Sequence, residues 1–330
     1  MKKKLTRRDF IVPLATATLG FTSLKSFAGR RNNTVVVGKR IGIIGLDTSH
    51  SVAFTKSLNK EDADAVFKGY KVVAAYPQGS LDILSSTERI PGYIEDVKKY
   101  GVEIVNSIAE LLTKVDVVML ETNDGRRHLE QALEVFKSGK RTFIDKPIAA
   151  SLKDAKAIFT AAEKYKVPVF SSSSLRYATN VQDVKNGKLG KVNGADTYSP
   201  MKFEKTHPDL FWYGIHGVEM LFTVMGTGCK SVWRTIGKDQ EVFTATWNDG
   251  RIGTFRGIKN GKQDYGGMAF GENGIEHLGP YNGYDPLLVE VINFFETGIS
   301  PVDKNETLEI CAFMEAADES KRKGGAEIRL

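Results

Sequence analysis

Residues 115–147 read VDVVMLETNDGRRHLEQALEVFKSGKRTFIDKP, and this stretch decides the fold. The apolar runs 115–120 and 142–144 predict two strands, and residues 128–138 between them predict a helix that ends at Gly139. This order predicts two parallel strands joined by a helix. Pro147 has no N–H to donate, so it ends the second strand. Lys146 therefore projects from the carboxyl end of a strand, where open α/β sheets bind ligands and where a lysine in a partly dry cleft can transfer protons.

The same alternation extends over residues 39–172. Near-continuous Val and Ile runs are typical of parallel strands that are covered on both faces. We predict a Rossmann-like, doubly wound α/β domain over 39–172, with strands at 40–44, 70–75, 102–105, 115–120, 142–144 and 167–172.

From residue 173 onwards the pattern changes to longer, alternating strands, at 191–198, 231–236, 241–247 and 251–258. Asn248-Asp249-Gly250 is a strong hairpin signal between the last two. Helices are expected at 210–225, 286–295 and 305–321, and six glycines predict a loop-rich flap at 260–285. Residues 173–330 are therefore predicted to form an α+β domain with a mostly antiparallel sheet, expected to bind substrate.

Residues 1–28 are expected to be a targeting signal and not part of the fold. Three lysines precede Thr6-Arg7-Arg8-Asp9-Phe10-Ile11, and the apolar run 11–21 is too short to span a bilayer. We interpret the segment as a twin-arginine signal of bacterial type, which predicts a periplasmic protein exported with its cofactor already bound. An ordinary secretory signal or a basic amphipathic anchor are the alternatives, and no other segment resembles a membrane span.

Charge and cysteine content exclude some partners. The whole chain carries +6, while the signal holds six basic residues and one acidic residue, so that the mature protein carries about +1. The high isoelectric point therefore does not indicate nucleic-acid binding. Cys229 and Cys311 lack metal-type spacing; they could form a disulfide or remain two buried thiols.

Taken together, these motifs make the chain resemble the Gfo/Idh/MocA oxidoreductase family over nearly all of its mature length. The most specific likeness is the strand 115–118, Thr122-Asn123, His128, Ser138-Gly139-Lys140 and Asp145-Lys146-Pro147, with Arg176-Tyr177 at the expected domain junction. The resemblance implies NAD or NADP as cofactor, and it implies that Lys146 contacts nicotinamide and substrate. Thr122, Asn123 and Arg176 match cofactor-binding positions, and Asp145 replaces the family's usual Glu.

The family's acid–base histidine often follows an Asp, in the pattern Asp-x-x-x-His. Here His216 is kept, but Trp212 stands where the Asp would be. An imidazole titrates near neutrality, so His216 suits acid–base chemistry; alternatively it is a core or capping residue. Asp209 could orient it, or could simply cap the helix that begins at Leu210. We expect no metal, because no set of residues matches a defined ligand pattern.

The dinucleotide loop departs most from the family. Gly45-Leu46-Asp47-Thr48-Ser49-His50 keeps only the first glycine of Gly-x-Gly-x-x-Gly. An unpaired Asp47 carboxylate about 4 Å from a phosphate would cost about 1 kcal/mol in water and about 4 kcal/mol near a protein surface. Thr48 and Ser49 could still offer hydroxyls to an anion at the helix start. Tyr76 replaces the ribose-binding acid, and it either stacks on adenine or packs.

Three functional hypotheses follow. The first is an oxidoreductase for a sugar, polyol or sugar derivative with tightly bound NAD or NADP, in which Lys146 polarises the oxygen and His216 transfers the proton. The second is a cofactor-free sugar-binding or scaffold protein of the same fold. The third is a lyase or glycoside-cleaving enzyme that uses Lys146 and His216 directly. The resemblance also implies a homo-oligomer through the second sheet.

Overall fold

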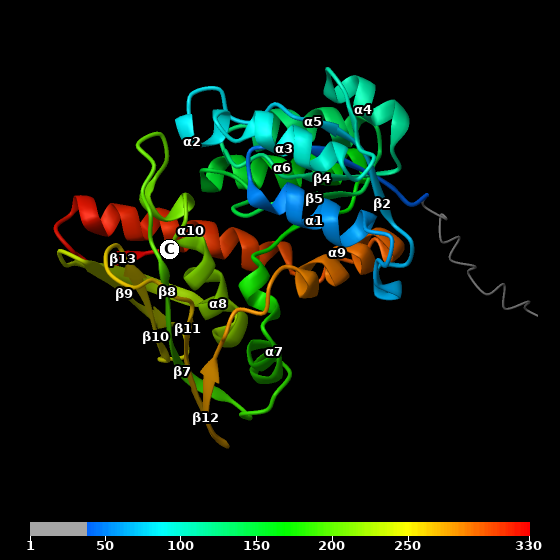
Figure 1. Ribbon diagram of the computed structural model, residues 1–330. Coiled ribbons are helices and arrows are strands. Elements are labelled where there is room, and N and C mark those ends of the chain that lie inside the picture. The colour runs from blue at the N-terminus through cyan, green and yellow to red at the C-terminus, as the bar shows by residue number, and fades with distance from the viewer. Residues whose placement is uncertain (1–37) are drawn as a thin grey trace, which may run out of the picture. The chain divides into compact units, whose positions relative to one another are not determined.

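Six parallel strands form the first sheet of the chain (Figure 1). A computed structural model describes residues 38–330, so the predicted signal segment lies outside the described residues. The sheet has the order β3-β2-β1-β4-β5-β6, and its strands are β1 Arg40–Ile44, β2 Lys71–Tyr76, β3 Glu103–Ile104, β4 Val117–Leu120, β5 Thr142–Ile144 and β6 Val169–Ser171. The order reverses between β1 and β4, which is the crevice where such sheets bind ligands. The predicted Rossmann-like sheet is confirmed.

Helices cover both faces of this sheet. One face packs against α4 Ile108–Lys114, α5 His128–Lys137 and α6 Leu152–Tyr165, and the other packs against α1 Ser49–Asn59, α3 Ile90–Lys98 and α9 Asp285–Thr297. The starts of α4 and α6 are capped, because the hydroxyls of Ser107 and Ser151 accept the N–H groups three residues later, at 3.0 and 3.1 Å.

Helix α9 follows the second sheet in sequence but packs on the first sheet. In Figure 1 it lies beside α1, and its buried residues belong to the same apolar cluster as Phe54 and Phe170. The rings of Phe170 and Phe294 meet edge to face with centroids 4.8 Å apart. Arg141, just before β5, donates hydrogen bonds to the carbonyls of Phe295 and Glu296 at the end of α9. The first sheet is therefore completed by a distant part of the chain.

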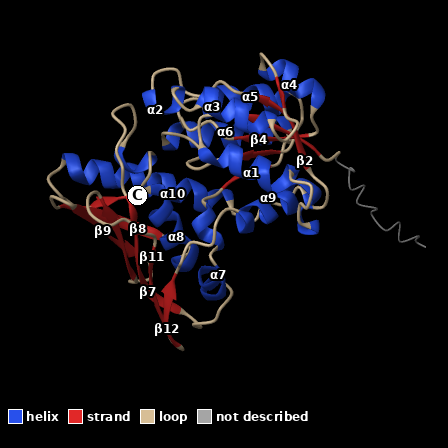
Figure 2. Ribbon diagram, viewed as in Figure 1, coloured by secondary structure: helices blue, strands red, loops and turns tan. Residues whose placement is uncertain are grey.

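The second sheet has seven strands in the order β12-β11-β7-β10-β9-β8-β13 (Figure 2). Only β7 and β10 pair in parallel, and the other neighbours are antiparallel, as expected. Helix α8 Ile215–Met225 packs on β7 and β10, and α10 Lys304–Arg322 packs on β8. The strands are β7 Val192–Pro200, β8 Cys229–Ile236, β9 Gln240–Trp247, β10 Ile252–Ile258, β11 Gly266–Gly271, β12 Gly274–Leu278 and β13 Ile328–Arg329.

Two local predictions need refinement. Residues 260–285 are loop-rich as expected, but they also contain the β11–β12 hairpin, which was not predicted. A glycine there serves close strand approach: a Cβ on Gly267 would lie 2.2 Å from a carbonyl oxygen of β7. The helix expected at 210–225 begins instead as the short 3₁₀ turn Asp209–Phe211 and becomes α-helical only at Ile215.

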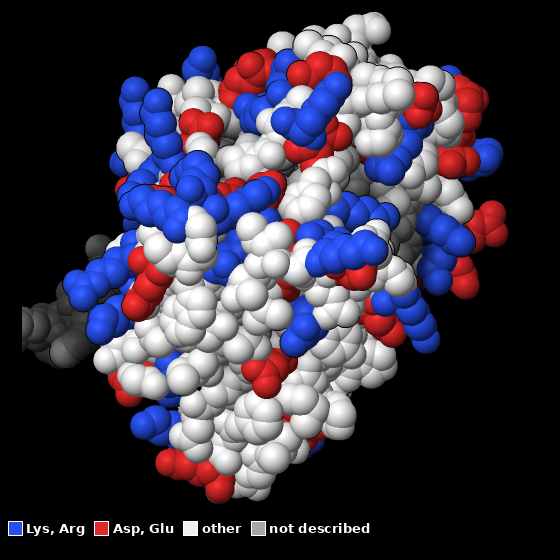
Figure 3. Space-filling view, turned by 90° about the vertical axis from the view of Figure 1, so that its left-hand side faces the viewer, with Lys and Arg blue, Asp and Glu red and all other residues white. Residues whose placement is uncertain are grey.

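The surface and the cysteines add little that is specific. Cys229 and Cys311 are both buried and free, so the disulfide alternative is wrong. Figure 3 shows basic and acidic side chains intermixed on one face of the molecule, above an area of mainly uncharged side chains. Among the helices of residues 38–330, none combines the length and the apolar character needed to cross a bilayer.

Candidate active site

A cavity of about 480 Å³ lies at the carboxyl ends of the first sheet's strands. Cofactor and ligand sites usually have volumes of roughly 300–1,000 Å³. One wall consists of the start of α1, the segment around α2 Leu84–Thr87 and α3, and the loops after β4 and β5. Residues 202–204, α8 and four tyrosines form the opposite wall. Among the predicted site residues, the lining includes Thr48, Ser49, Asn123, Lys146 and His216. Lys146 follows β5 of the first sheet and His216 lies on α8, which packs on the second sheet, yet both line this one cavity.

Lys146 is positioned by the end of β5. The N–H of Asp145 donates to the carbonyl of Leu120 at 2.8 Å, so the chain stays paired to β4 until just before the lysine. The Lys146 side chain is 8% exposed, and its Nζ lies 3.6 Å from Oδ2 of Asp145. Burial acts to raise the pKa of Asp145, but the contact with His50 and the charge of Lys146 hold that pKa below its ordinary value. Asp145 is therefore an ionised partner behind the cavity wall.

His216 is the second residue of α8. Its Nδ1 lies 2.8 Å from the hydroxyl of Ser173, whose backbone N–H donates to Glu219 at 2.9 Å. Burial lowers the pKa of His216 well below its ordinary value, and the nearby Lys146 and His50 lower it further. The imidazole is therefore neutral near neutral pH, and it can accept a hydrogen bond or a proton.

Asp209 does not orient His216, contrary to the sequence-based expectation. Its carboxylate lies 2.6 Å from Arg234 and 2.7 Å from Lys321. Burial acts to raise the pKa of Asp209, but these two cations lower it below the ordinary value. Asp209 therefore belongs to an ion-pair network at the second sheet, and Ser173 takes the place of the expected carboxylate beside His216.

Arg176 does not reach the cavity either. It is fully buried, with Nε 2.8 Å from Glu219 and Nη2 2.5 Å from Glu306. Since Glu219 also accepts the Ser173 N–H, Arg176 acts on the site only by holding the residues behind His216. Glu219 and Asp209 are thus each paired with a buried arginine, Arg176 and Arg234 respectively.

The start of α1 could hold an anion. Thr48 precedes the helix without a side-chain cap bond, and Thr48, Ser49 and His50 line the cavity together with Arg89. N–H groups of a first helical turn have no partner within the helix, and they attract anions. Together with Lys146, these residues fit the pyrophosphate of a dinucleotide.

Asp47 turns away from this cavity. It is fully buried, and its carboxylate accepts the N–H groups of Ser80 at 3.1 Å and Asn123 at 3.0 Å, in the loops that follow β2 and β4. Burial raises the pKa of Asp47, although these hydrogen bonds oppose the rise. The carboxylate is thus not an unpaired charge facing a phosphate. It does bridge the loops on either side of β1, where the second glycine of the fingerprint would leave open space.

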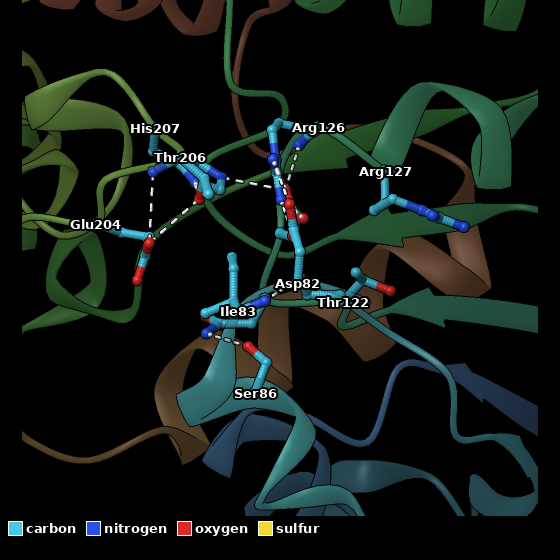
Figure 4. Close-up of polar contacts among 12 residues, drawn as sticks. Asp82, Ile83, Ser86, Thr122, Arg126, Arg127, Glu204, Thr206 and His207 are labelled. Atoms are coloured by element: carbon cyan, nitrogen blue, oxygen red, sulfur yellow. Dashed lines mark hydrogen bonds and ion pairs between the residues drawn. The ribbon is translucent and has the colours of Figure 1, made fainter.

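The region that would hold the adenosine end of a dinucleotide is the part of the site that departs most from the usual dinucleotide-binding pattern. Tyr76 is partly buried against the main apolar cluster and does not line the cavity, so packing is the better of its two expected roles. Arg126, after β4, binds Asp82, after β2, with Nη1 3.2 Å from Oδ2, and it also binds Asp124 (Figure 4). His207 lies 3.1 Å from the same Asp124. These contacts link the loops across the crevice.

Three further predicted positions lie just behind the wall. Gly45 has φ of +91°, and a Cβ there would lie 2.5 Å from the backbone nitrogen of Thr122, so the close approach of two loops requires glycine. Thr122 and Asp145 are buried and do not line the cavity. Their contribution is to shape the loops after β4 and β5.

A buried polar cluster lies beneath Lys146 and was not predicted. His50, Glu121 and Asp145 each provide one nitrogen or oxygen atom of a kind that can bind a metal ion, and these three atoms lie within 4.8 Å of one another. Both carboxyl oxygens of Glu121 are buried without a hydrogen-bond partner among the described residues. Burial and the charge of Asp145 raise the pKa of Glu121 well above its ordinary value, so it is a neutral acid. The sequence signal was an acid at the carboxyl end of β4.

Comparison with known proteins places this geometry in context. Residues 39–173 match the model of the family described as GFO_IDH_MocA, an oxidoreductase family with an NAD-binding Rossmann fold. The matched segment is the part of the chain that carries the first sheet. The NAD-type cofactor and the oxidoreductase class expected from the sequence agree with the description of that family. No curated protein sequence matches the chain.

Solved structures similar to this chain share its fold at low sequence identity. The myo-inositol 2-dehydrogenase of Lactobacillus plantarum is 15% identical, with a TM-score of 0.72 over 88% of this chain and 99% of that one. The Lactobacillus casei myo-inositol dehydrogenase, solved with NAD(H) and myo-inositol, is 17% identical, with a TM-score of 0.69 over 89% and 97%. The WlbA dehydrogenase of Bordetella pertussis, solved with NADH and UDP-GlcNAcA, is 19% identical, with a TM-score of 0.68 over 88% and 97%.

Proposed function

We propose that the chain is an NAD- or NADP-dependent oxidoreductase that acts on a hydroxyl group of a sugar, polyol or sugar derivative. The observation that carries the proposal is that Lys146 and His216 line one cavity with the anion-attracting start of α1. Such a cavity can hold a pyrophosphate at one end and a small polar substrate at the other. The sugar and polyol substrates named for similar structures support this substrate class.

The aromatic wall supports a sugar-like substrate. Trp212 and the tyrosines line the cavity, and the hydroxyls of Tyr213 and Tyr265 lie 2.8 Å apart. Aromatic rings offer flat apolar faces for the C–H side of a sugar, and tyrosine hydroxyls can donate or accept hydrogen bonds at its edge. The neighbouring Phe211 is fully buried and packs in the core.

The chemistry divides between a cofactor and the side chains. When bound, a nicotinamide dinucleotide accepts a hydride from a substrate carbon or returns one. The Lys146 ammonium polarises the substrate oxygen, and Asp145 behind it keeps the ammonium directed along the end of β5. Proton transfer falls to a histidine of the cavity wall, and His216 is the one that the sequence predicts.

Binding of nucleotide tests this proposal directly. Gently purified full-length protein should carry NAD or NADP detectable by mass spectrometry, or should bind one of them on calorimetric titration. Lys146→Met should abolish turnover of the polyol that the wild type oxidises, while the exposed Lys99→Met variant should not change it. Absence of both bound and titratable nucleotide would refute the proposal.

A second candidate is a cofactor-free sugar-binding protein of the same fold. The bridge of Asp47 to the loops after β2 and β4, with the Arg126–Asp82 pair, favours it, because these contacts occupy the adenosine side of the crevice. This candidate predicts sugar binding without nucleotide binding. Product formed by nucleotide-free protein would instead select the lyase alternative.

Location and assembly complete the proposal. We propose export to the periplasm through a twin-arginine signal at residues 1–28, which fits an enzyme that keeps its cofactor through repeated turnovers. We propose self-association through the outer face of the second sheet, where Tyr198 and Ile252 are exposed. Light scattering on the mature chain and on its Ile252→Lys variant tests the second point. We expect the wild type to be a dimer and the variant a monomer. A variant that keeps the mass of a dimer would contradict the proposed interface.

A further inference from the structure

We propose that His50, held by Asp145, is the residue that exchanges a proton with the substrate hydroxyl in this cavity. The inference rests on the proposed oxidoreductase function and deepens it, because it moves acid–base chemistry from His216 to the first turn of α1. The substrate class is a compound with a free hydroxyl on the carbon that is oxidised, such as a polyol or sugar.

The first argument is the contact with a carboxylate. Nδ1 of His50 lies 3.0 Å from Oδ2 of Asp145, and both side chains are almost fully buried. A carboxylate acceptor holds the imidazole hydrogen on the nitrogen that faces it, and thereby fixes the tautomer. His216 has only the hydroxyl of Ser173 at its Nδ1, and a hydroxyl can either donate or accept.

The second argument is the position of the other ring nitrogen. His50 lines the cavity, and Nδ1 is the ring nitrogen that faces Asp145. Since Nδ1 carries the hydrogen, Nε2 is the free acceptor on the cavity side. Its ring packs against Tyr284 at 4.6 Å and Phe54 at 5.7 Å between centroids, which restrains its orientation.

The third argument is how Asp145 is shared. The same Oδ2 lies 3.0 Å from His50 and 3.6 Å from Lys146, so one carboxylate joins the two groups of the cavity floor. Glu121, beneath them, has no other partner and is kept neutral by burial beside Asp145. A neutral Glu121 leaves Asp145 as the single negative charge between an ammonium and an imidazole.

A metal ion is the other occupant that His50, Glu121 and Asp145 could hold, since imidazole and carboxylate are common ligands. The Lys146 ammonium already lies beside Asp145 and supplies the positive charge there. A divalent cation in the same place would face that ammonium at short range. We therefore assign the cluster to proton transfer.

The proposed step is balanced with the hydride transfer described above. The substrate O–H bond breaks, and its proton moves to Nε2 of His50 while the Asp145 carboxylate stays beside Nδ1–H. The electron pair left on oxygen forms the carbonyl as the hydride leaves the carbon for the nicotinamide. Lys146 stabilises the negative charge that develops on that oxygen.

Nitrogen NMR of the imidazoles tests the assignment without any substrate. The chain contains five histidines, so the spectrum of uniformly ¹⁵N-labelled protein is assignable by single variants. We expect the signal lost in His50→Gln to report the Nδ1–H tautomer in the wild type. Asp145→Asn should abolish that preference, and Asp145→Glu, which keeps a carboxylate, should preserve it. An Nε2–H tautomer at His50 would overturn the proposal.

Kinetics supply the second test. With a polyol that the wild type oxidises, His50→Gln should lower kcat by about 10²- to 10⁴-fold with little change in KM. The exposed His277→Gln is the matched control and should be unaffected. A large loss in His216→Gln with none in His50→Gln would overturn the proposal while leaving the oxidoreductase function intact. Missing nucleotide binding refutes the function instead, and the NMR result still decides the tautomer.

Metal analysis distinguishes the remaining alternative. Wild type and Glu121→Gln should both contain no stoichiometric divalent cation by plasma mass spectrometry, before and after incubation with Mn²⁺ or Zn²⁺ and desalting. One cation per chain in the wild type that disappears in Glu121→Gln would overturn the proton-transfer assignment in favour of a metal site.

Discussion

Replacing Asp47 by alanine should measure how strongly the loops around β1 are joined. The carboxylate accepts two buried backbone N–H groups, those of Ser80 and Asn123. A buried donor left without a partner costs about 1–3 kcal/mol, so two donors cost roughly 2–6 kcal/mol. The substitution also removes a buried carboxylate, and because burial disfavours its charged form, this removal offsets part of the cost. We expect the free energy of unfolding to fall by about 3 kcal/mol.

Equilibrium urea unfolding at neutral pH is the measurement, with the m-value checked for constancy. Asp62→Ala is the matched control, because its side chain is 88% exposed and its nearest cation lies 3.8 Å away. That control should stay within about 0.5 kcal/mol of the wild type. A loss below about 0.5 kcal/mol in Asp47→Ala would show that the two N–H groups do not depend on the carboxylate.

Three further predictions concern the rest of the fold. Arg176→Met should lower the free energy of unfolding by about 3–5 kcal/mol, because it leaves Glu219 buried without its cation; an unchanged urea midpoint would contradict this. Burial raises the pKa of Asp318 from 3.8 to about 6. The folded carboxyl thus keeps its proton to higher pH than the unfolded one, and this stabilisation, present below about pH 4, is lost as the pH rises to about 6. Asp318→Asn should lack that component of the pH profile, and parallel profiles would refute it. Gly267→Ala should cost about 1–3 kcal/mol by steric overlap with β7, whereas Gly92→Ala, with open space, should cost nothing; equal stabilities would be the contrary result.

The first sheet was predictable because parallel strands leave a local signature. The apolar run 142–144 and its proline specify a strand and its end without reference to the rest of the chain. The position of Lys146 at the cavity followed from that strand end alone. Pairwise contacts between distant residues left no such signature.

Asp209 shows this limit. Its sequence position before a helix suggested capping or orientation of His216, but its partners Arg234 and Lys321 come from β8 and the end of α10. The hairpin within 260–285 was missed for a related reason. Composition cannot distinguish a glycine that loosens a loop from one that lets two strands approach.

The position of α9 has a consequence for how the chain is made. Its apolar side packs in the cluster that contains Phe170 of β6 and Phe54 of α1. Its residues 285–297 nevertheless leave the ribosome after nearly all of the second sheet. Until then the emerging N-terminal half presents an open apolar face. The two halves are therefore not separate folding units, and a fragment cut after residue 173 would lack part of its own interior.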